Sequence, residues 1–285
     1  MGKTTPLTAR EEEILRTVRY YRYITTQDIL TLYFASGSKK YAQALMASLA
    51  GNKDLDTHNY LCRFTLPSVH KRAQEKVYVL GSKGRQVLRQ LGLPVSWYFR
   101  PHKLKFLSYS YVLHNLILTR FLVACEQWAK AHPAYNLVEK QICYELSGKV
   151  IPDAWVWFEE KAADGIYDQA VIFEIDRGME DKAKFRQHVL SRIQFLQSGD
   201  YKKTFHTNTA SIAYATTGQL PEYREARRKS MCSMIMQLLK ERRLEQWARI
   251  FKVTSLEFHA LYDNSLFESE VWFRPDSDTP VRLFD

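Results

Sequence analysis

The 285-residue chain is poor in cysteine, glycine and proline, and it has no long apolar run. Its four cysteines lie far apart and form no CxxC pair, which argues against a zinc ribbon or a thioredoxin-like motif. Eleven glycines and nine prolines exclude a collagen-like or linker-dominated chain. The most apolar long stretch, Tyr111–Trp128, contains several polar and charged residues and predicts a buried helix, not a membrane span.

Several nucleotide-binding and hydrolase motifs are also missing. The patterns GxxxxGK[ST], GxGxxG, GxSxG and HExxH do not occur, so the corresponding sites have no support. The first residues, MGKTTPLTAREEE, lack the apolar segment of a signal peptide. We therefore expect a cytoplasmic protein with reduced thiols and no membrane partner.

Positive charge is abundant and unevenly distributed, within a formal net charge of +10. Residues 1–110 hold 18 Lys and Arg against 7 Asp and Glu, a net charge of +11. Residues 111–285 hold 23 Lys and Arg against 24 Asp and Glu. A basic module beside a near-neutral one predicts that the first binds a polyanion and that the second has another role.

Residues 1–92 are predicted to form a winged helix-turn-helix domain. A capping box at Thr8–Glu11 begins the first helix, and a second helix follows Thr25 or Thr26. A third helix begins at Lys39, and a glycine ends it. Two extended segments with a basic tip between them and a closing helix complete the element order of such a domain.

In a winged helix the third helix enters the major groove and the hairpin tip follows the phosphates. The residues expected to contact double-stranded DNA are Lys39, Lys40, Tyr41 and Gln43 on the third helix and His70, Lys71 and Arg72 at the tip. Lysine reaches phosphate or guanine, and glutamine pairs with adenine. The alternatives are a protein-interaction module and a merely solvated basic surface.

Residues 93–110 contain two prolines and no helical period, and we interpret them as a connector. Residues 111–285 are predicted to form a second domain that begins with a long helix, Tyr111–Ala131. Three strands, a helix, a strand, a helix and a strand follow, with a turn expected at Glu159–Gly165. This order predicts an α/β sandwich around a mixed central sheet.

Carboxylates are placed at the ends of two expected strands of this domain. Asp153 begins one strand, and Glu174 and Asp176 end the next on the same face. If the two strands pair antiparallel, Asp153 and Glu174 converge. Such oxygens, with Glu139 from the preceding segment, are ligands that Mg²⁺ or Mn²⁺ prefers.

This arrangement resembles the PD-(D/E)xK fold of restriction endonucleases, with Pro152-Asp153 as one half of the motif and Glu174-Ile175-Asp176 as the other. The resemblance implies that Asp153 and Glu174 hold the metal, with Glu139 and Asp176 in support. The motif lysine is missing, because Asp176 occupies its position. The cations that could replace it are Arg177, Lys182 and Lys184.

The whole chain is similar to the replication-relaxation family of plasmids and other mobile elements. The similarity covers roughly residues 8–258 and includes the segments VYVLGSKG, LHNLILT, PDAWVWF and FEIDRG in this order. It implies a winged-helix N-terminus, a nuclease-like C-terminus and a role in plasmid replication, DNA relaxation or mobilisation.

Two functions are open on this basis. One is a DNA-binding protein with a Mg²⁺- or Mn²⁺-dependent endodeoxyribonuclease domain. The other is a non-catalytic replication or transcription regulator in which the nuclease-like domain is a dimerisation or protein-docking scaffold. The long helix Tyr111–Ala131 is a candidate face for a homodimer, and replication or mobilisation proteins are candidate partners.

Overall fold

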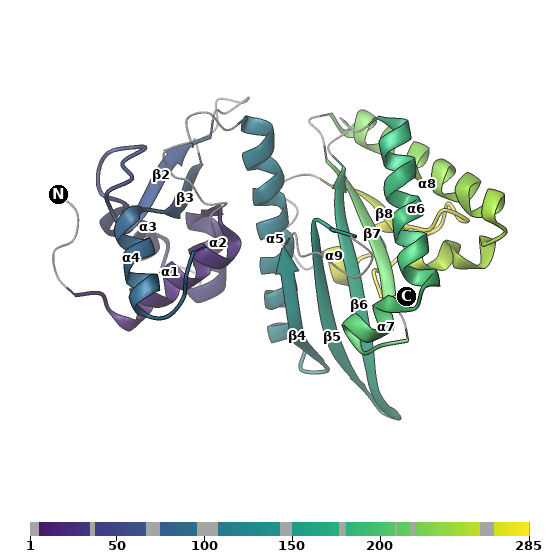
Figure 1. Cartoon of the computed structure of the whole chain (residues 1–285), viewed down its shortest axis with the longest axis horizontal. Coiled ribbons are helices and arrows are strands. Elements are labelled where there is room, and N and C mark those ends of the chain that lie inside the picture. Colours follow the sequence, from purple (N-terminus) through teal and green to yellow (C-terminus); the bar gives the residue numbers. More distant parts are fainter. Residues whose placement is uncertain are drawn as a thin grey trace. The chain divides into compact units, whose positions relative to one another are not determined.

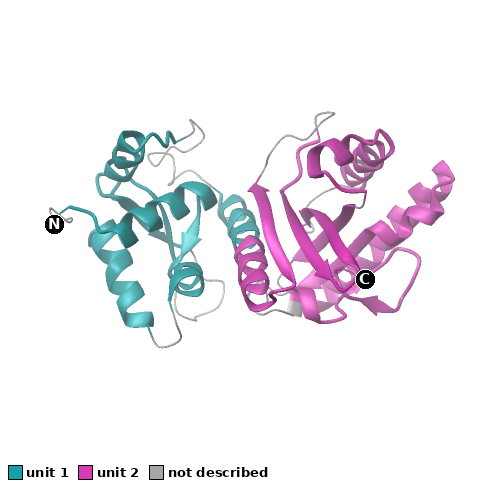
Figure 2. Ribbon diagram, turned by 90° about the horizontal axis from the view of Figure 1, so that it is seen from below, with its two compact units in different colours: residues 1–119 teal, residues 120–285 magenta. Residues whose placement is uncertain are grey.

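The computed structural model describes residues 6–34, 38–66, 75–95, 108–142, 150–176, 181–208, 210–217, 220–256 and 265–284. The chain divides into two compact units, residues 1–119 and residues 120–285, coloured separately in Figure 2. The division falls inside the long helix α5 (Tyr109–Ala131) and not in the segment 93–110. Helices and a mixed multi-stranded sheet confirm the expected mixed α/β fold class.

The first unit contains a small helical layer and a three-stranded antiparallel sheet of order β1-β3-β2 (Figure 1). Its elements before α5 are α1 (Ala9–Tyr21), β1 (Ile24–Thr25), α2 (Thr26–Tyr33), α3 (Lys39–Ala50), β2 (Leu61–Thr65), β3 (Lys76–Leu80) and α4 (Ser82–Gln90). The order of helices and hairpin strands is the predicted one. The short strand β1, which pairs with β3, was not predicted from the sequence.

Two capping boxes define the helix starts in this unit. The Thr8 side chain accepts from Glu11 N, and the Glu11 carboxylate accepts from Thr8 N at 2.8 Å. Thr25 and Asp28 repeat this exchange at the start of α2. Both boxes satisfy backbone N–H groups that a helix leaves without partners in its first turn, which is why the chain turns helical at these residues.

Helix α4 begins in direct contact with the backbone of the segment before β2. Gly81 N donates to Tyr60 O at 2.9 Å, and Ser82 N donates to Thr57 O at 2.7 Å. A Cβ atom at Gly84 would lie 2.2 Å from Tyr60 O. Because no side chain fits there, glycine is required for α4 to approach the hairpin this closely.

The second unit contains the second half of α5 and a seven-stranded mixed sheet among its described residues, in the order β10-β9-β8-β7-β6-β5-β4. Its remaining elements are β4 (Tyr135–Ile142), β5 (Ala154–Ala162), β6 (Gly165–Asp176), α6 (Lys182–Gln197), α7 (Asp200–Phe205), β7 (Ala210–Thr217), α8 (Pro221–Arg242), η3 (Glu245–Ile250), β8 (Phe251–Leu256), α9 (Ser265–Glu268), β9 (Trp272–Phe273) and β10 (Pro280–Val281). Strands β6, β7 and β8 are parallel, and the flanking pairs are antiparallel.

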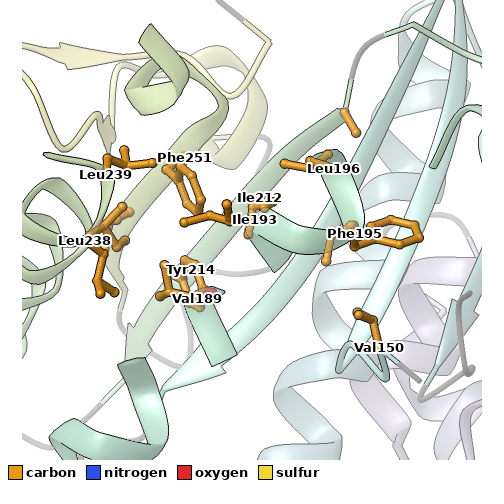
Figure 3. Packing of buried hydrophobic residues seen from close by; sticks show 14 of the residues in the cluster. Val150, Val189, Ile193, Phe195, Leu196, Ile212, Tyr214, Leu238, Leu239 and Phe251 are labelled. Carbon is orange, nitrogen blue, oxygen red and sulfur yellow. The ribbon is translucent and has the colours of Figure 1, made fainter. Parts of the chain in front are cut away.

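Helices cover both faces of this sheet (Figure 1). On one face Phe121 of α5 stacks on Phe173 of β6, with ring centroids 3.6 Å apart. On the other face α6 and α8 pack on the central strands, and Figure 3 shows Val189 beside Tyr214 and Ile193 beside Ile212. Because both faces are buried, the central strands β6 and β7 contain the apolar runs Ala170–Phe173 and Ile212–Ala215.

The structure corrects one prediction for this domain and adds elements that the sequence did not predict. The turn expected at Glu159–Gly165 is wrong, because β5 continues to Ala162 and pairs with β6 as far as Gly165. The helix expected before the last predicted strand ends at Arg242, where Arg243 adopts a left-handed conformation. The C-terminal elements α9, β9 and β10 were not predicted. Apolar residues of α5 are buried, among them Leu116, Leu122 and Trp128.

Candidate functional site

One candidate surface lies on α3. Lys39, Lys40 and Gln43 are exposed, and Tyr41 is 60% exposed. On the opposite side of the helix a stripe of apolar residues packs into the core of the unit: Ala42, Met46, Leu49 and Ala50. This stripe follows the helical period, so the polar side chains necessarily share the outer face.

The strands after α3 are joined near the connected end of the hairpin by an ion-pair group. Asp54 binds Arg63 at 2.8 Å and Lys76 at 2.9 Å, and Thr65 also donates to it at 3.2 Å. Although slight burial works against the charged form, these partners lower the pKa of Asp54. The predicted contact residues at the hairpin tip, His70, Lys71 and Arg72, lie outside the described residues.

The second candidate site lies at the carboxyl end of β6. Strands β5 and β6 pair antiparallel, with Ala154 opposite Phe173, so Asp153 lies beside Glu174. The Asp153 carboxylate accepts from Ile175 N at 2.8 Å, and the Glu174 carboxylate accepts from Asp153 N. The expected convergence of these two carboxylates is therefore present.

Arg192 of α6 holds Glu174. Its Nε donates to Glu174 Oε1 at 2.7 Å, its Nη2 donates to the same oxygen, and Nη2 also donates to Ile151 O at 3.1 Å. The Arg192 and Glu174 side chains are only 5% and 10% exposed, respectively. Burial raises the pKa of Glu174 against the opposing charge of Arg192, and the neighbouring Asp153 raises it further.

A second, partly buried pair lies two residues further along the strand. Arg227 Nε of α8 donates to Asp176 Oδ2 at 2.6 Å, and the Asp176 side chain is 3% exposed. Glu174 and Asp176 point to the same face of β6, as strand alternation requires, and bind cations from α6 and α8 respectively. The two pairs thus attach both covering helices to the end of one strand.

The other predicted site residues are not part of this group. Glu139 is exposed on β4 and lies opposite Trp157, four residues along β5 from Asp153. Lys182 and Lys184 are exposed in the first turn of α6, and Lys184 N donates to the N-cap residue Asp181. Arg177 lies outside the described residues.

Sequence reasoning missed Arg192 and Arg227, which supply the cations of the site. A signal for Arg192 was present, because it falls on the apolar stripe of α6 with Phe185, Val189 and Leu196. A charged residue on the buried face of a helix requires a buried partner of opposite charge. Arg227 gave no such signal, since it lies within a run of basic and acidic residues.

The donor set at this site does not match a Mg²⁺ or Mn²⁺ site in the present arrangement. Glu174 Oε1 receives two N–H groups of Arg192, and Asp153 Oδ2 receives a backbone N–H. Among the described residues, no group of three or more His, Cys, Asp or Glu side chains is placed to hold a metal ion. Cations of this kind need carboxylate oxygens that are open to them.

The fold and the site define a mixed α/β protein in which a basic unit precedes a sheet domain with ion-paired carboxylates. The chain matches the replication-relaxation family over residues 15–211 and belongs to that family. Membership indicates a role in the replication of plasmids or other mobile elements. No curated protein and no solved structure matches the chain. None of the described helices is long and apolar enough to span a membrane.

Proposed function

We propose that this chain is a double-stranded-DNA-binding replication protein of a plasmid or other mobile element. Its first unit would act as a winged helix-turn-helix domain and place α3 in the major groove. The observation that carries the proposal is the exposed row Lys39, Lys40, Tyr41 and Gln43 on a helix whose other face is buried.

The chemistry of this row matches duplex DNA. The two lysines suit phosphate or guanine, and Gln43 suits the edge of adenine in the major groove. The net charge of +11 on residues 1–110 supplies the attraction to a polyanion. The hairpin-tip residues His70, Lys71 and Arg72 would add phosphate contacts.

Salt-dependent binding of a labelled mixed-sequence duplex tests this proposal. Lys39→Ala/Lys40→Ala removes two phosphate contacts, so the slope of log Kobs against log salt should become shallower by about 0.9 per contact. Fluorescence anisotropy over a salt series measures this slope.

The matched control is Lys202→Ala/Lys203→Ala. This pair is exposed on α7 in the second unit, and its removal changes the net charge of the chain by the same amount. The slope of this variant should equal that of the parent protein. Equal slopes for the α3 variant and the parent protein would refute the proposal.

We further propose that the second unit acts without metal-dependent cleavage, as a scaffold in the replication complex. This proposal is supported by the buried pair of Arg192 and Glu174, in which the cation already occupies the carboxylate oxygen. Incubation of supercoiled plasmid with the protein and Mg²⁺ or Mn²⁺ should leave the plasmid intact. Nicking that disappears in both Asp153→Ala and Glu174→Ala would instead establish the nuclease.

A further inference from the structure

We infer that Arg10 belongs to the DNA-binding surface that includes Tyr41, so that this surface runs from the first turn of α1 to the first turn of α3. This inference rests on the proposed DNA-binding function. It adds a phosphate-binding arginine from a helix that sequence reasoning did not connect with DNA, and it gives Phe34 a positioning role.

A chain of ring contacts joins the two helices. The Arg10 guanidinium carbon lies 5.1 Å from the Tyr33 ring centroid and 5.8 Å from that of Phe34. The Phe34 ring in turn meets the Tyr41 ring edge to face, with centroids 5.5 Å apart at 71°. Arg10 is therefore connected to the exposed row of α3 through two contacts.

The aromatic link is itself held in place by α1 and α2. The Tyr33 hydroxyl is hydrogen-bonded to the hydroxyl of Thr17, which lies on the buried face of α1. Phe34 is the C-cap residue of α2, and its backbone N–H donates to Leu30 O at 3.0 Å. A guanidinium that lies over such rings is attracted by their π-faces and restricted in direction.

Arg10 keeps donors for a ligand. Its Nη1 binds Glu13 at 2.9 Å, but the two side chains are 43% and 49% exposed, and an ion pair in water is weak. The guanidinium has five N–H donors in a planar fork, which suits the oxygens of a phosphate. Tyr41, at 60% exposure beside Lys39 and Lys40, supplies an aromatic face and a hydroxyl for the sugar-phosphate backbone.

Duplex binding by Arg10→Ala tests the inference, with Arg16→Ala as the matched control. Both arginines are exposed on α1 and both variants lose one charge, but Arg16 has none of these ring contacts in the described structure. We expect Arg10→Ala to make the salt slope shallower by about 0.9 and Arg16→Ala to leave it unchanged. Equal slopes for the two variants would overturn the inference.

Substitution of Phe34 tests the link. Phe34→Leu should weaken duplex binding and reduce the further effect of Arg10→Ala on that binding. Phe34→Tyr keeps the ring, so it should preserve both the duplex affinity and the effect of Arg10→Ala. Full additivity of Phe34→Leu and Arg10→Ala would refute the positioning role. If the lysine variant of α3 alters the slope and Arg10→Ala does not, only this inference fails. If neither variant alters it, the proposed DNA-binding function fails as well.

Discussion

At the scale of single residues, the cations that bind the buried carboxylates of the second unit are the least expected feature of the molecule. Arg192 and Arg227 each bind one carboxylate of β6, and both carboxylates are nearly inaccessible to water. A charge in this environment is stable only while its partner is present, because burial without a partner carries a large desolvation cost. The pairs therefore make α6 and α8 dependent on the end of β6.

Replacement of Arg192 tests this dependence. Arg192→Met leaves Glu174 buried without its cation and should lower the free energy of unfolding by about 3–5 kcal/mol. The control Arg186→Met breaks the exposed pair of Arg186 and Glu241 and should cost no more than about 1 kcal/mol. Urea unfolding measures both values, and equal values would contradict the structural role of the buried pair.

The same variant should change the pH dependence of stability. Without Arg192 only the hydrogen bond from Asp153 N still opposes the rise that burial causes in the pKa of Glu174, so this pKa rises further than in the parent protein. The folded state then holds a proton that the unfolded chain releases near about pH 4.3. Stability should consequently decrease as the pH rises from about 5 to about 8, and Arg192→Met/Glu174→Gln should remove this decrease. A pH-independent difference between Arg192→Met and the parent protein would refute this assignment.

At the scale of elements, the position of α4 depends on the absence of a side chain. Gly81 and Gly84 allow the helix to approach the backbone of Asn59 and Tyr60, whose carbonyl oxygens accept from its first N–H groups. This contact anchors α4 against the hairpin that follows α3. Two glycines thus allow α4 to pack against the hairpin.

Gly84→Ala should therefore destabilise the first unit. The added Cβ would lie 2.2 Å from a backbone carbonyl oxygen that has no rotamer to change, so we expect a loss of about 1–3 kcal/mol or more. Gly165→Ala is the control, because nothing lies within 4 Å of a Cβ at that position. Thermal unfolding followed by circular dichroism should show a lower midpoint only for Gly84→Ala.

At the scale of the whole molecule, one helix belongs to both compact units. The division falls between Thr119 and Arg120 of α5. Thr119 donates to Tyr23 O at 2.8 Å within the first unit, whereas Phe121 stacks on Phe173 within the second. Because the hydrogen-bonded turns of α5 continue across this point, loss of order in one unit shortens the helix on which the other packs.

We accordingly predict that the two units unfold together. Gly84→Ala lies in the first unit, while five of the six tryptophans of the chain lie beyond residue 119. If α5 couples the units, the variant should lower the midpoint of the tryptophan-fluorescence transition as well as that of the circular-dichroism transition. A fluorescence midpoint that stays at the parent value would show that the units unfold independently.

The sequence predicted most of the fold wherever the signal was local. A capping box marked the start of α1, a threonine marked the start of α2, and a glycine marked the end of α3. The antiparallel pairing that brings Asp153 to Glu174 followed from a short connection between two strands. The length of this hairpin could not be predicted from the sequence. Glu159 and Glu160 remain extended because they bond to β4 and β6, and sequence patterns do not reveal these bonds.

The distribution of charge, the family and the outer face of α3 were thus determined by the sequence itself, since each depends on residue identity and short-range spacing. Only the tertiary structure decided which cations meet the carboxylates of β6. Arg192 lies 18 residues and Arg227 lies 51 residues from their partners, and folding selected them over the nearer Lys182 and Lys184. The physical reason is burial: a carboxylate enclosed by two helices takes the cation that those helices carry on their inner faces.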